Sequence, residues 1–150
     1  ILSMTALACA LDCFDSVQDC VPGQDVMAAL RSKSLALTDM FITLFDERCA
    51  GYELEFVTPR THALRGSQVS LARATGAYAI MQALIARGVI GDFRAGAGTG
   101  NPRDADILRF GLTPLYLGFA DVWRAVDHLC QIMDSGEWRD DKFNQKHAVT

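Results

Sequence analysis

Arg109 is the residue whose type and setting most favour a chemical role in this sequence of 150 residues. It lies in the segment 107–112, which alternates with the two-residue period of a β-strand. The apolar side chains predicted to share the face toward the helices are Leu108, Phe110 and Leu112. Arg109 then points the opposite way, and Gly111 beside it leaves room for a ligand.

A guanidinium group at such a position can bind an anion, because its planar fork holds a carboxylate through two parallel hydrogen bonds, which a lysine cannot do. The alternative is an arginine that is solvated or forms a structural salt bridge. The pattern alone leaves both open and favours the alternative.

A second candidate is the glycine-rich stretch from Gly96 to Gly100, which follows a predicted strand as a phosphate-binding loop would. Another strand comes after it rather than a helix whose N-terminus could receive a phosphate, so a hairpin loop is the better interpretation. The lysines are Lys33, Lys142 and Lys146, and none has the context of a lysine that forms a Schiff base.

The histidines and cysteines do not suggest a metal site. His62 lies near Arg60 and Arg65, where a small basic site is possible but a solvated loop is favoured, and His128 is predicted to be a surface residue. The five cysteines form no Cys-x-x-Cys pair and are interpreted as buried thiols in a reducing cytoplasm: Cys9, Cys13, Cys20, Cys49 and Cys130.

Composition and charge indicate an ordinary globular domain. The net charge of -4 argues against a polyanion-binding surface such as nucleic acid requires. No apolar run approaches the roughly 20 residues that span a bilayer, and the apolar segment Met4 to Leu11 lacks the basic start of a signal peptide. Because Ile1 opens directly into a helical pattern, we expect a preceding portion of a longer protein.

The elements that must position these residues are predicted by periodicity and by start and stop signals. The predicted helices cover 3–17, 25–50, 75–86 and 119–135, and the predicted strands cover 53–58, 67–71, 89–94 and 107–112. Ser3, Asp25 and Thr75 are predicted helix caps, and Gly88 a helix stop. The helix over 3–17 is apolar on most sides and therefore expects several partners.

The C-terminal part of the chain combines a regular apolar helix with a polar end. The last helix carries the clearest apolar stripe, at Phe119, Val122, Trp123, Val126, Leu129, Cys130 and Met133, and residues 137–150 form a polar tail. The predicted fold is α+β: one domain, 1–150, with a small, mostly antiparallel sheet and helices packed on one face.

Three motifs together resemble the C-terminal small domain of bacterial kynureninases. They are Arg65-Gly-Ser-Gln-Val-Ser, Gly88-Val-Ile-Gly-Asp-Phe-Arg and Asp106-Ile-Leu-Arg-Phe-Gly-Leu-Thr-Pro-Leu-Tyr, the last being the most specific. Leu35-Ala-Leu-Thr-Asp and His147-Ala-Val-Thr agree with it, so the resemblance covers essentially the whole chain.

The resemblance implies a fold-type I (aspartate aminotransferase-like) enzyme that uses pyridoxal 5'-phosphate, works as a cytoplasmic homodimer and takes part in tryptophan degradation. Such an enzyme hydrolyses kynurenine or 3-hydroxykynurenine to anthranilate or 3-hydroxyanthranilate and alanine. In the family, the arginine that matches Arg109 binds the α-carboxylate of the substrate. The cofactor-binding lysine belongs to the large domain, which is absent here, so no catalytic, cofactor-binding or metal-binding residue is expected in this chain.

The sequence departs from the family pattern at one place, and two alternative functions remain open. Gly96 to Ala105 looks like a glycine-rich insertion between two strands that the family joins by a very short link. The small domain of another fold-type I enzyme, such as a cysteine desulfurase or an aminotransferase, also uses an arginine for the substrate carboxylate. A non-catalytic interaction module is the alternative from a different class.

Overall fold

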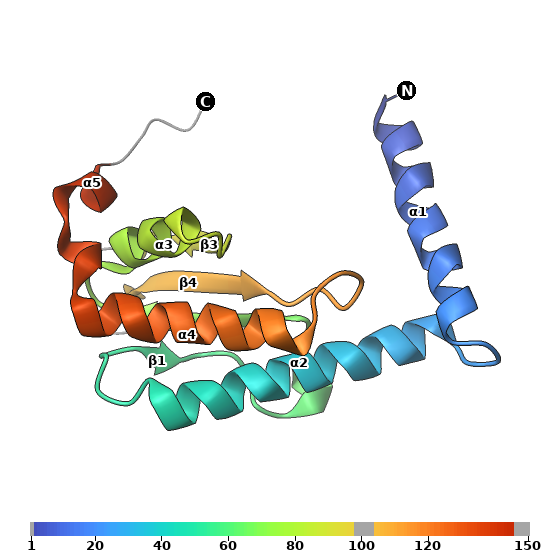
Figure 1. The fold of residues 1–150 in the computed structure, drawn as a ribbon, viewed down its shortest axis with the longest axis horizontal. Helices are drawn as coiled ribbons and strands as arrows, with labels where there is room; N and C mark the ends of the chain where they lie inside the picture. The colour runs from blue at the N-terminus through green and yellow to red at the C-terminus, as the bar shows by residue number, and fades with distance from the viewer. Residues whose placement is uncertain (1, 98–103, 146–150) are drawn as a thin grey trace.

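The chain folds as α+β, with a four-stranded antiparallel sheet and helices on one of its faces (Figure 1). The computed structural model describes residues 2–97 and 104–145. In chain order the elements are α1 (Leu2–Cys20), α2 (Val26–Arg48), β1 (Glu55–Phe56), the 3-10 turn η1 (His62–Leu64), β2 (Gln68–Arg73), α3 (Ala77–Ala86), β3 (Asp92–Arg94), β4 (Asp106–Gly111), α4 (Phe119–Ser135), η3 (Glu137–Arg139) and α5 (Asp141–Asn144). The predicted α+β class, with helices packed on one face of a small antiparallel sheet, is confirmed.

The strand order is β1-β2-β4-β3, and the three strand pairs among the described residues are all antiparallel. The ladder between β2 and β4 is the longest and pairs Ser70 with Arg109. On the other side of β4, Asp92 of β3 is the direct partner of Arg109. Arg109 therefore lies on an inner strand and has a neighbouring side chain on each flank.

The core lies between the sheet and α2, α3 and α4. The alternating residues of β2 and β4 that face it are Val69, Leu71, Leu108 and Phe110, all at most 5% exposed. The helices contribute Leu37 and Phe41 from α2, Ile80 and Leu84 from α3, and Val126 and Leu129 from α4. Because the three helices share this one core, the opposite face of the sheet, with Arg109 on it, carries none of them.

Some predicted helix ends are confirmed and others are wrong. The Asp25 carboxylate accepts a hydrogen bond of 2.8 Å from the Ala28 amide and caps α2, as predicted. Gly88 has the predicted left-handed conformation, with a φ of 83°. Ser3 is not a cap because it lies inside α1, which also runs three residues beyond the predicted end, to Cys20.

Thr75 is not the cap of α3 either. The cap position belongs to Gly76, which has a φ of 79° and makes no side-chain capping bond. A Cβ atom at Gly76 would stand 2.4 Å from Cζ3 of Trp138, so the glycine also makes room for this ring. Packing of Trp138, which the pattern did not predict, fixes where α3 begins.

Two predicted strands are shorter in the structure: 53–58 is reduced to Glu55–Phe56 and 89–94 to Asp92–Arg94. The other two, 67–71 and 107–112, correspond to Gln68–Arg73 and Asp106–Gly111. The amide of Val89 donates to the carbonyl of Leu84 at 2.9 Å, which makes Val89 part of the end of α3 rather than of β3.

The predicted polar tail from residue 137 is wrong for its described part. It contains η3 (Glu137–Arg139) and α5 (Asp141–Asn144), and Trp138 and Phe143 pack against the core. On α4 the apolar stripe is buried at Val122, Val126, Leu129 and Cys130, whereas Phe119 and Trp123 are about half exposed.

Helix α1 does not have the several partners that its apolar composition led us to expect. None of its described residues is buried, and it projects away from the sheet beyond the start of α2 (Figure 1). Its exposed apolar side chains include Leu2, Met4, Leu7 and Leu11. None of the helices within residues 2–97 and 104–145 has the length and apolar character needed to cross a bilayer.

Candidate functional site

The orientation predicted for Arg109 is confirmed. Leu108 and Phe110 are buried against the helices, while Arg109 points to the opposite face and its side chain is 33% exposed. Gly111 lies two residues along the same face, and a Cβ atom there would meet nothing within 4 Å. The guanidinium thus lies beside open space, on the sheet face that no helix within residues 2–97 and 104–145 covers.

Among the described residues, Gln68 and Asp92 contact this guanidinium. Its Nη2 donates to Oε1 of Gln68 at 3.1 Å, and its Nη1 lies 3.4 Å from Oδ2 of Asp92. Both contacts use the terminal nitrogens. The Nε–H is buried and has no hydrogen-bond partner among the described residues. Each terminal nitrogen carries a second N–H that these two contacts do not use, so the arrangement can accept a ligand with a carboxylate or another anionic group.

The sequence reasoning did not single out Gln68 or Asp92 as site residues. Both lie in segments that were used for the resemblance, but their roles depend on which strands are neighbours. Cross-strand pairing puts Asp92 opposite Arg109 and Gln68 opposite Gly111. The alternation on each strand could have placed them on the correct face, whereas the strand order was not predicted.

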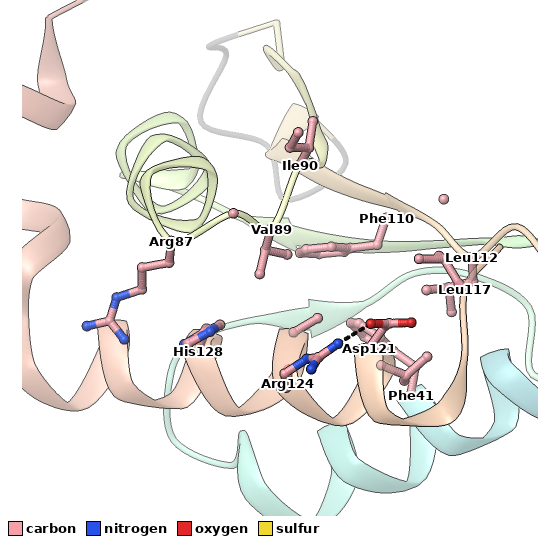
Figure 2. A pocket seen from close by; sticks show the side chains of 14 residues that line it. Phe41, Arg87, Val89, Ile90, Phe110, Leu112, Leu117, Asp121, Arg124 and His128 are labelled. Carbon is pink, nitrogen blue, oxygen red and sulfur yellow. Dashed lines mark hydrogen bonds and ion pairs between the residues drawn. The ribbon is translucent and has the colours of Figure 1, made fainter.

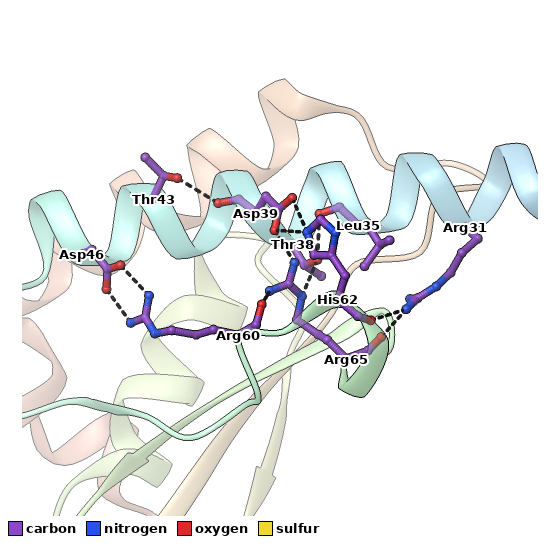
Figure 3. Close-up of polar contacts among 9 residues, drawn as sticks. All are labelled: Arg31, Leu35, Thr38, Asp39, Thr43, Asp46, Arg60, His62 and Arg65. Atoms are coloured by element: carbon purple, nitrogen blue, oxygen red, sulfur yellow. Dashed lines mark hydrogen bonds and ion pairs between the residues drawn. The ribbon is translucent and has the colours of Figure 1, made fainter.

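The basic residues around His62 do not form a free anion site (Figure 3). Arg65 is buried: its Nε donates to Oγ1 of Thr38 at 3.0 Å, its Nη1 donates to the Arg60 carbonyl at 2.7 Å, and its Nη2 pairs with Asp39. The imidazole of His62 contacts the same carboxylate at 2.8 Å. The solvated loop predicted here is wrong for Arg65, because burial and ion pairing on α2 hold it.

Two further contacts complete this attachment of the loop to α2. Arg60 makes two hydrogen bonds, of 2.6 and 2.8 Å, with the carboxylate of Asp46, and this bonding lowers the pKa of Asp46 below its ordinary value. Arg31 donates to the carbonyls of His62 and Arg65 at 2.7 Å each. The cations of this cluster are therefore neutralised or occupied, and their role is structural.

A cavity of about 340 Å³ lies between α4, the end of α3 and the helix-facing side of β4 (Figure 2). His128 lines it and is half-buried, with Nδ1 buried and unpartnered among the described residues, so its prediction as a surface residue is wrong. The arginines at the cavity are already paired. Arg87 binds Glu137 at 2.8 Å, which lowers the pKa of that carboxyl, and Arg124 pairs with Asp121.

The thiols divide into two groups. Cys49 and Cys130 are buried, as predicted, and their sulfur atoms lie 3.9 Å apart. Burial raises the pKa of the Cys49 thiol to about 12. The prediction is wrong for Cys9, Cys13 and Cys20, which are exposed because α1 has no covering element.

The described residues do not fit a site for pyridoxal 5'-phosphate. The ammonium of Lys33 donates to the Pro114 carbonyl at 2.7 Å, and that of Lys142 pairs with Asp140 at 3.3 Å. Neither has the desolvated setting of a cofactor lysine. Lys146 and residues 98–103 of the predicted insertion from Gly96 to Ala105 lie outside the described residues. No group of metal-binding side chains is found within the described residues.

Comparison with known proteins decides the family. The model of the kynureninase C-terminal domain matches residues 30–129. The chain belongs to the kynureninase C-terminal domain family. Kynureninases of Burkholderia mallei (strain SAVP1) and Burkholderia pseudomallei (strain K96243) are each 51% identical to it, and the kynureninase of Pseudomonas fluorescens is 49% identical, over 150 residues in each case.

The matches to kynureninases cover the whole chain but only 32% of each relative. The chain thus spans about a third of the length of the curated kynureninases that it resembles. The segment matched by the family model includes β2, β3 and β4, and with them Gln68, Asp92 and Arg109.

Proposed function

We propose that this domain is the C-terminal small domain of a kynureninase, in which Arg109 binds the α-carboxylate of the substrate. The complete enzyme, a cytoplasmic homodimer of fold-type I, hydrolyses kynurenine or 3-hydroxykynurenine to anthranilate or 3-hydroxyanthranilate and alanine in tryptophan degradation. The observation that carries the assignment to Arg109 is its one-third-exposed side chain on the sheet face that no helix of the described structure covers, with N–H groups on both terminal nitrogens that Gln68 and Asp92 leave unused.

The role of Arg109 in this proposal is to orient the substrate. A guanidinium on an inner strand is held by backbone pairing on both sides. A fork of this kind fixes the plane and direction of a carboxylate as well as its position. A substrate held in this way presents its reacting group in the correct orientation, which lowers the entropic part of the reaction barrier.

The cofactor, pyridoxal 5'-phosphate, is assigned to the part of the enzyme that this chain does not contain. Neither described lysine is placed to bind it, since both are engaged by other groups. The domain contributes a substrate-binding residue rather than a catalytic one, and by itself it is expected to be inactive.

Replacement of Arg109 in the complete enzyme tests this proposal. The Arg109→Ala variant should raise the KM for kynurenine at least about tenfold, since a hydrogen-bonded contact between charged groups contributes about 1.5–3 kcal/mol. The Arg109→Lys variant should have a KM between those of Arg109→Ala and the parent enzyme, because an ammonium group lacks the planar fork.

Arg124→Ala is the matched control, because it removes an exposed arginine from α4, on the opposite side of the sheet. It should leave the KM within about twofold of the parent value, as expected for a surface ion pair. A KM that is unchanged in Arg109→Ala would move Arg109 to a structural role and refute the proposed site.

A further inference from the structure

The sheet face that carries Arg109 also carries a row of polar side chains across three strands. Ser70 of β2 and Asp92 of β3 are the direct cross-strand partners of Arg109 on β4. Gln68 lies two residues before Ser70 and therefore on the same face. No helix of the described structure covers these side chains, so they surround the guanidinium where a ligand would meet it.

Gln68 is fixed at both ends of its amide. Its Nε2 donates to Oγ of Ser70 at 3.1 Å, and its Oε1 accepts from Nη2 of Arg109 at 3.1 Å. A neutral acceptor orients a guanidinium without neutralising it. The charge of Arg109 thus stays available to a ligand while its direction is set.

Asp92 makes a different and weaker kind of contact. Its Oδ2 lies 3.4 Å from Nη1 of Arg109 and 3.1 Å from Nη2 of Arg94, and the side chain is 47% exposed. The carboxylate is therefore shared between two arginines and open to solvent. Ion pairs in such settings contribute little and exchange readily.

On the basis of the proposed function, we propose that Gln68 positions the Arg109 guanidinium for the substrate carboxylate. In the same proposal, Asp92 is the counter-ion that this carboxylate displaces. Asp92 keeps the arginine paired in the absence of substrate. An incoming carboxylate can take its place at Nη1 while Gln68 holds Nη2. Gly111 leaves the adjoining space open, since a Cβ atom there would meet nothing within 4 Å.

The two neighbours should therefore change the KM in opposite directions. In the complete enzyme, Gln68→Leu should raise the KM for kynurenine about fivefold, the factor expected for one lost hydrogen bond. Asp92→Asn should lower it about two- to threefold, because a competing exposed ion pair is removed. Both variants should leave kcat within about twofold, because they change the binding of the substrate and of the transition state equally.

Two further variants separate positioning from a general structural effect. Gln68→Glu keeps the size of the side chain but places a competing carboxylate beside Arg109, so it should raise the KM more than Gln68→Leu does. Glu55→Gln removes an acidic group from the same sheet face next to Ala72, away from Arg109, and should leave the KM unchanged. In an Arg109→Ala background, the effects of both Gln68→Leu and Asp92→Asn should vanish.

The outcomes distinguish the two proposals. The positioning proposal alone would be overturned if Arg109→Ala raises the KM about tenfold while Gln68→Leu leaves it unchanged. A raised KM in Asp92→Asn would overturn it in the same way. Effects that persist in the Arg109→Ala background would overturn it as well. An unchanged KM in Arg109→Ala would remove the proposed function and, with it, any role for these neighbours.

Discussion

Arg65 and Arg109 carry the same group but occupy opposite surroundings. Arg65 has a side chain only 1% exposed, and its three nitrogen atoms all bind partners on α2 or in its own loop. Arg109 is 33% exposed, and its Nε is unpartnered among the described residues. The buried arginine is therefore suited to hold the fold together, and the half-exposed one is suited to meet a ligand.

The role assigned to Arg65 predicts a large loss of stability when its counter-ion is removed. Asp39→Ala leaves a buried guanidinium without a negative partner and should lower the free energy of unfolding by about 2–3 kcal/mol, somewhat below the usual range because Asp39 is 46% exposed. Asp46→Ala is the matched control, since it breaks the exposed pair with Arg60 and should lose less than about 1 kcal/mol. Urea denaturation measures both, and equal losses would contradict the structural role of Arg65.

The five thiols should differ sharply in reactivity. The thiolate is the reactive form, and the raised pKa of Cys49, about 12, keeps that group protonated at pH 8. Ellman's reagent at pH 8 should therefore label Cys9, Cys13 and Cys20 rapidly and reach the buried Cys49 and Cys130 only after denaturant is added. Rapid labelling of all five in the native chain would show that the contact between α2 and α4 opens readily.

For single residues, the sequence predicted which way a side chain points but not which groups it contacts. Two-residue alternation placed Arg109 on the face away from the helices, because a strand side chain can point only one way or the other. The ion pair of Arg65 joins residues 26 apart in the chain and depends on how a loop lies on α2. No local pattern encodes that distance, so the loop was interpreted as solvated.

Two predicted helix ends are confirmed where a local signal acts through the backbone. Asp25 caps α2 and Gly88 ends α3 because a side-chain acceptor and a left-handed residue work within one turn. The start of α3 was misplaced because it depends on Trp138, which comes about 60 residues later. The short elements after residue 136 were missed for the same reason, since apolar contacts rather than periodicity form them.

Packing at Gly76 predicts a selective effect of adding one methyl group. Gly76→Ala should lower the free energy of unfolding by about 2–4 kcal/mol, because it combines a positive φ with a clash against the Trp138 ring. Gly88→Ala has a similar φ but no atom within 4 Å of the added Cβ, and should lose only about 1–2 kcal/mol. Thermal unfolding followed by circular dichroism compares the two, and equal shifts would argue against the packing role of Trp138.

The whole molecule has one well-packed face of the sheet and one face that no helix of the described structure covers. The chain spans about a third of the length of the curated kynureninases, and its candidate ligand-binding residue lies on the uncovered face. Helix α1 projects from the same domain (Figure 1), and its apolar side chains are exposed. In our proposal the remainder of the enzyme supplies the cofactor opposite Arg109.

Fold class was predictable at this scale because periodicity and turn signals indicate the number and type of the elements. Strand order was not, since it depends on pairings between segments far apart in the chain. The family came from three motifs on β2, β3 and β4, and the comparisons confirm it. The role of Arg109 stays a prediction, because its ligand would be held between this domain and another.

The central claim is that Arg109 recognises a substrate carboxylate, and a substrate that lacks the charge tests it most directly. In the complete enzyme, kcat/KM is measured for L-kynurenine and for its α-carboxamide, with the parent protein and with the Arg109→Ala variant. The parent should prefer the carboxylate at least about tenfold, as a charge-assisted contact requires, and the variant should lose this preference. A variant that retains the full preference for the carboxylate would contradict the assignment of Arg109.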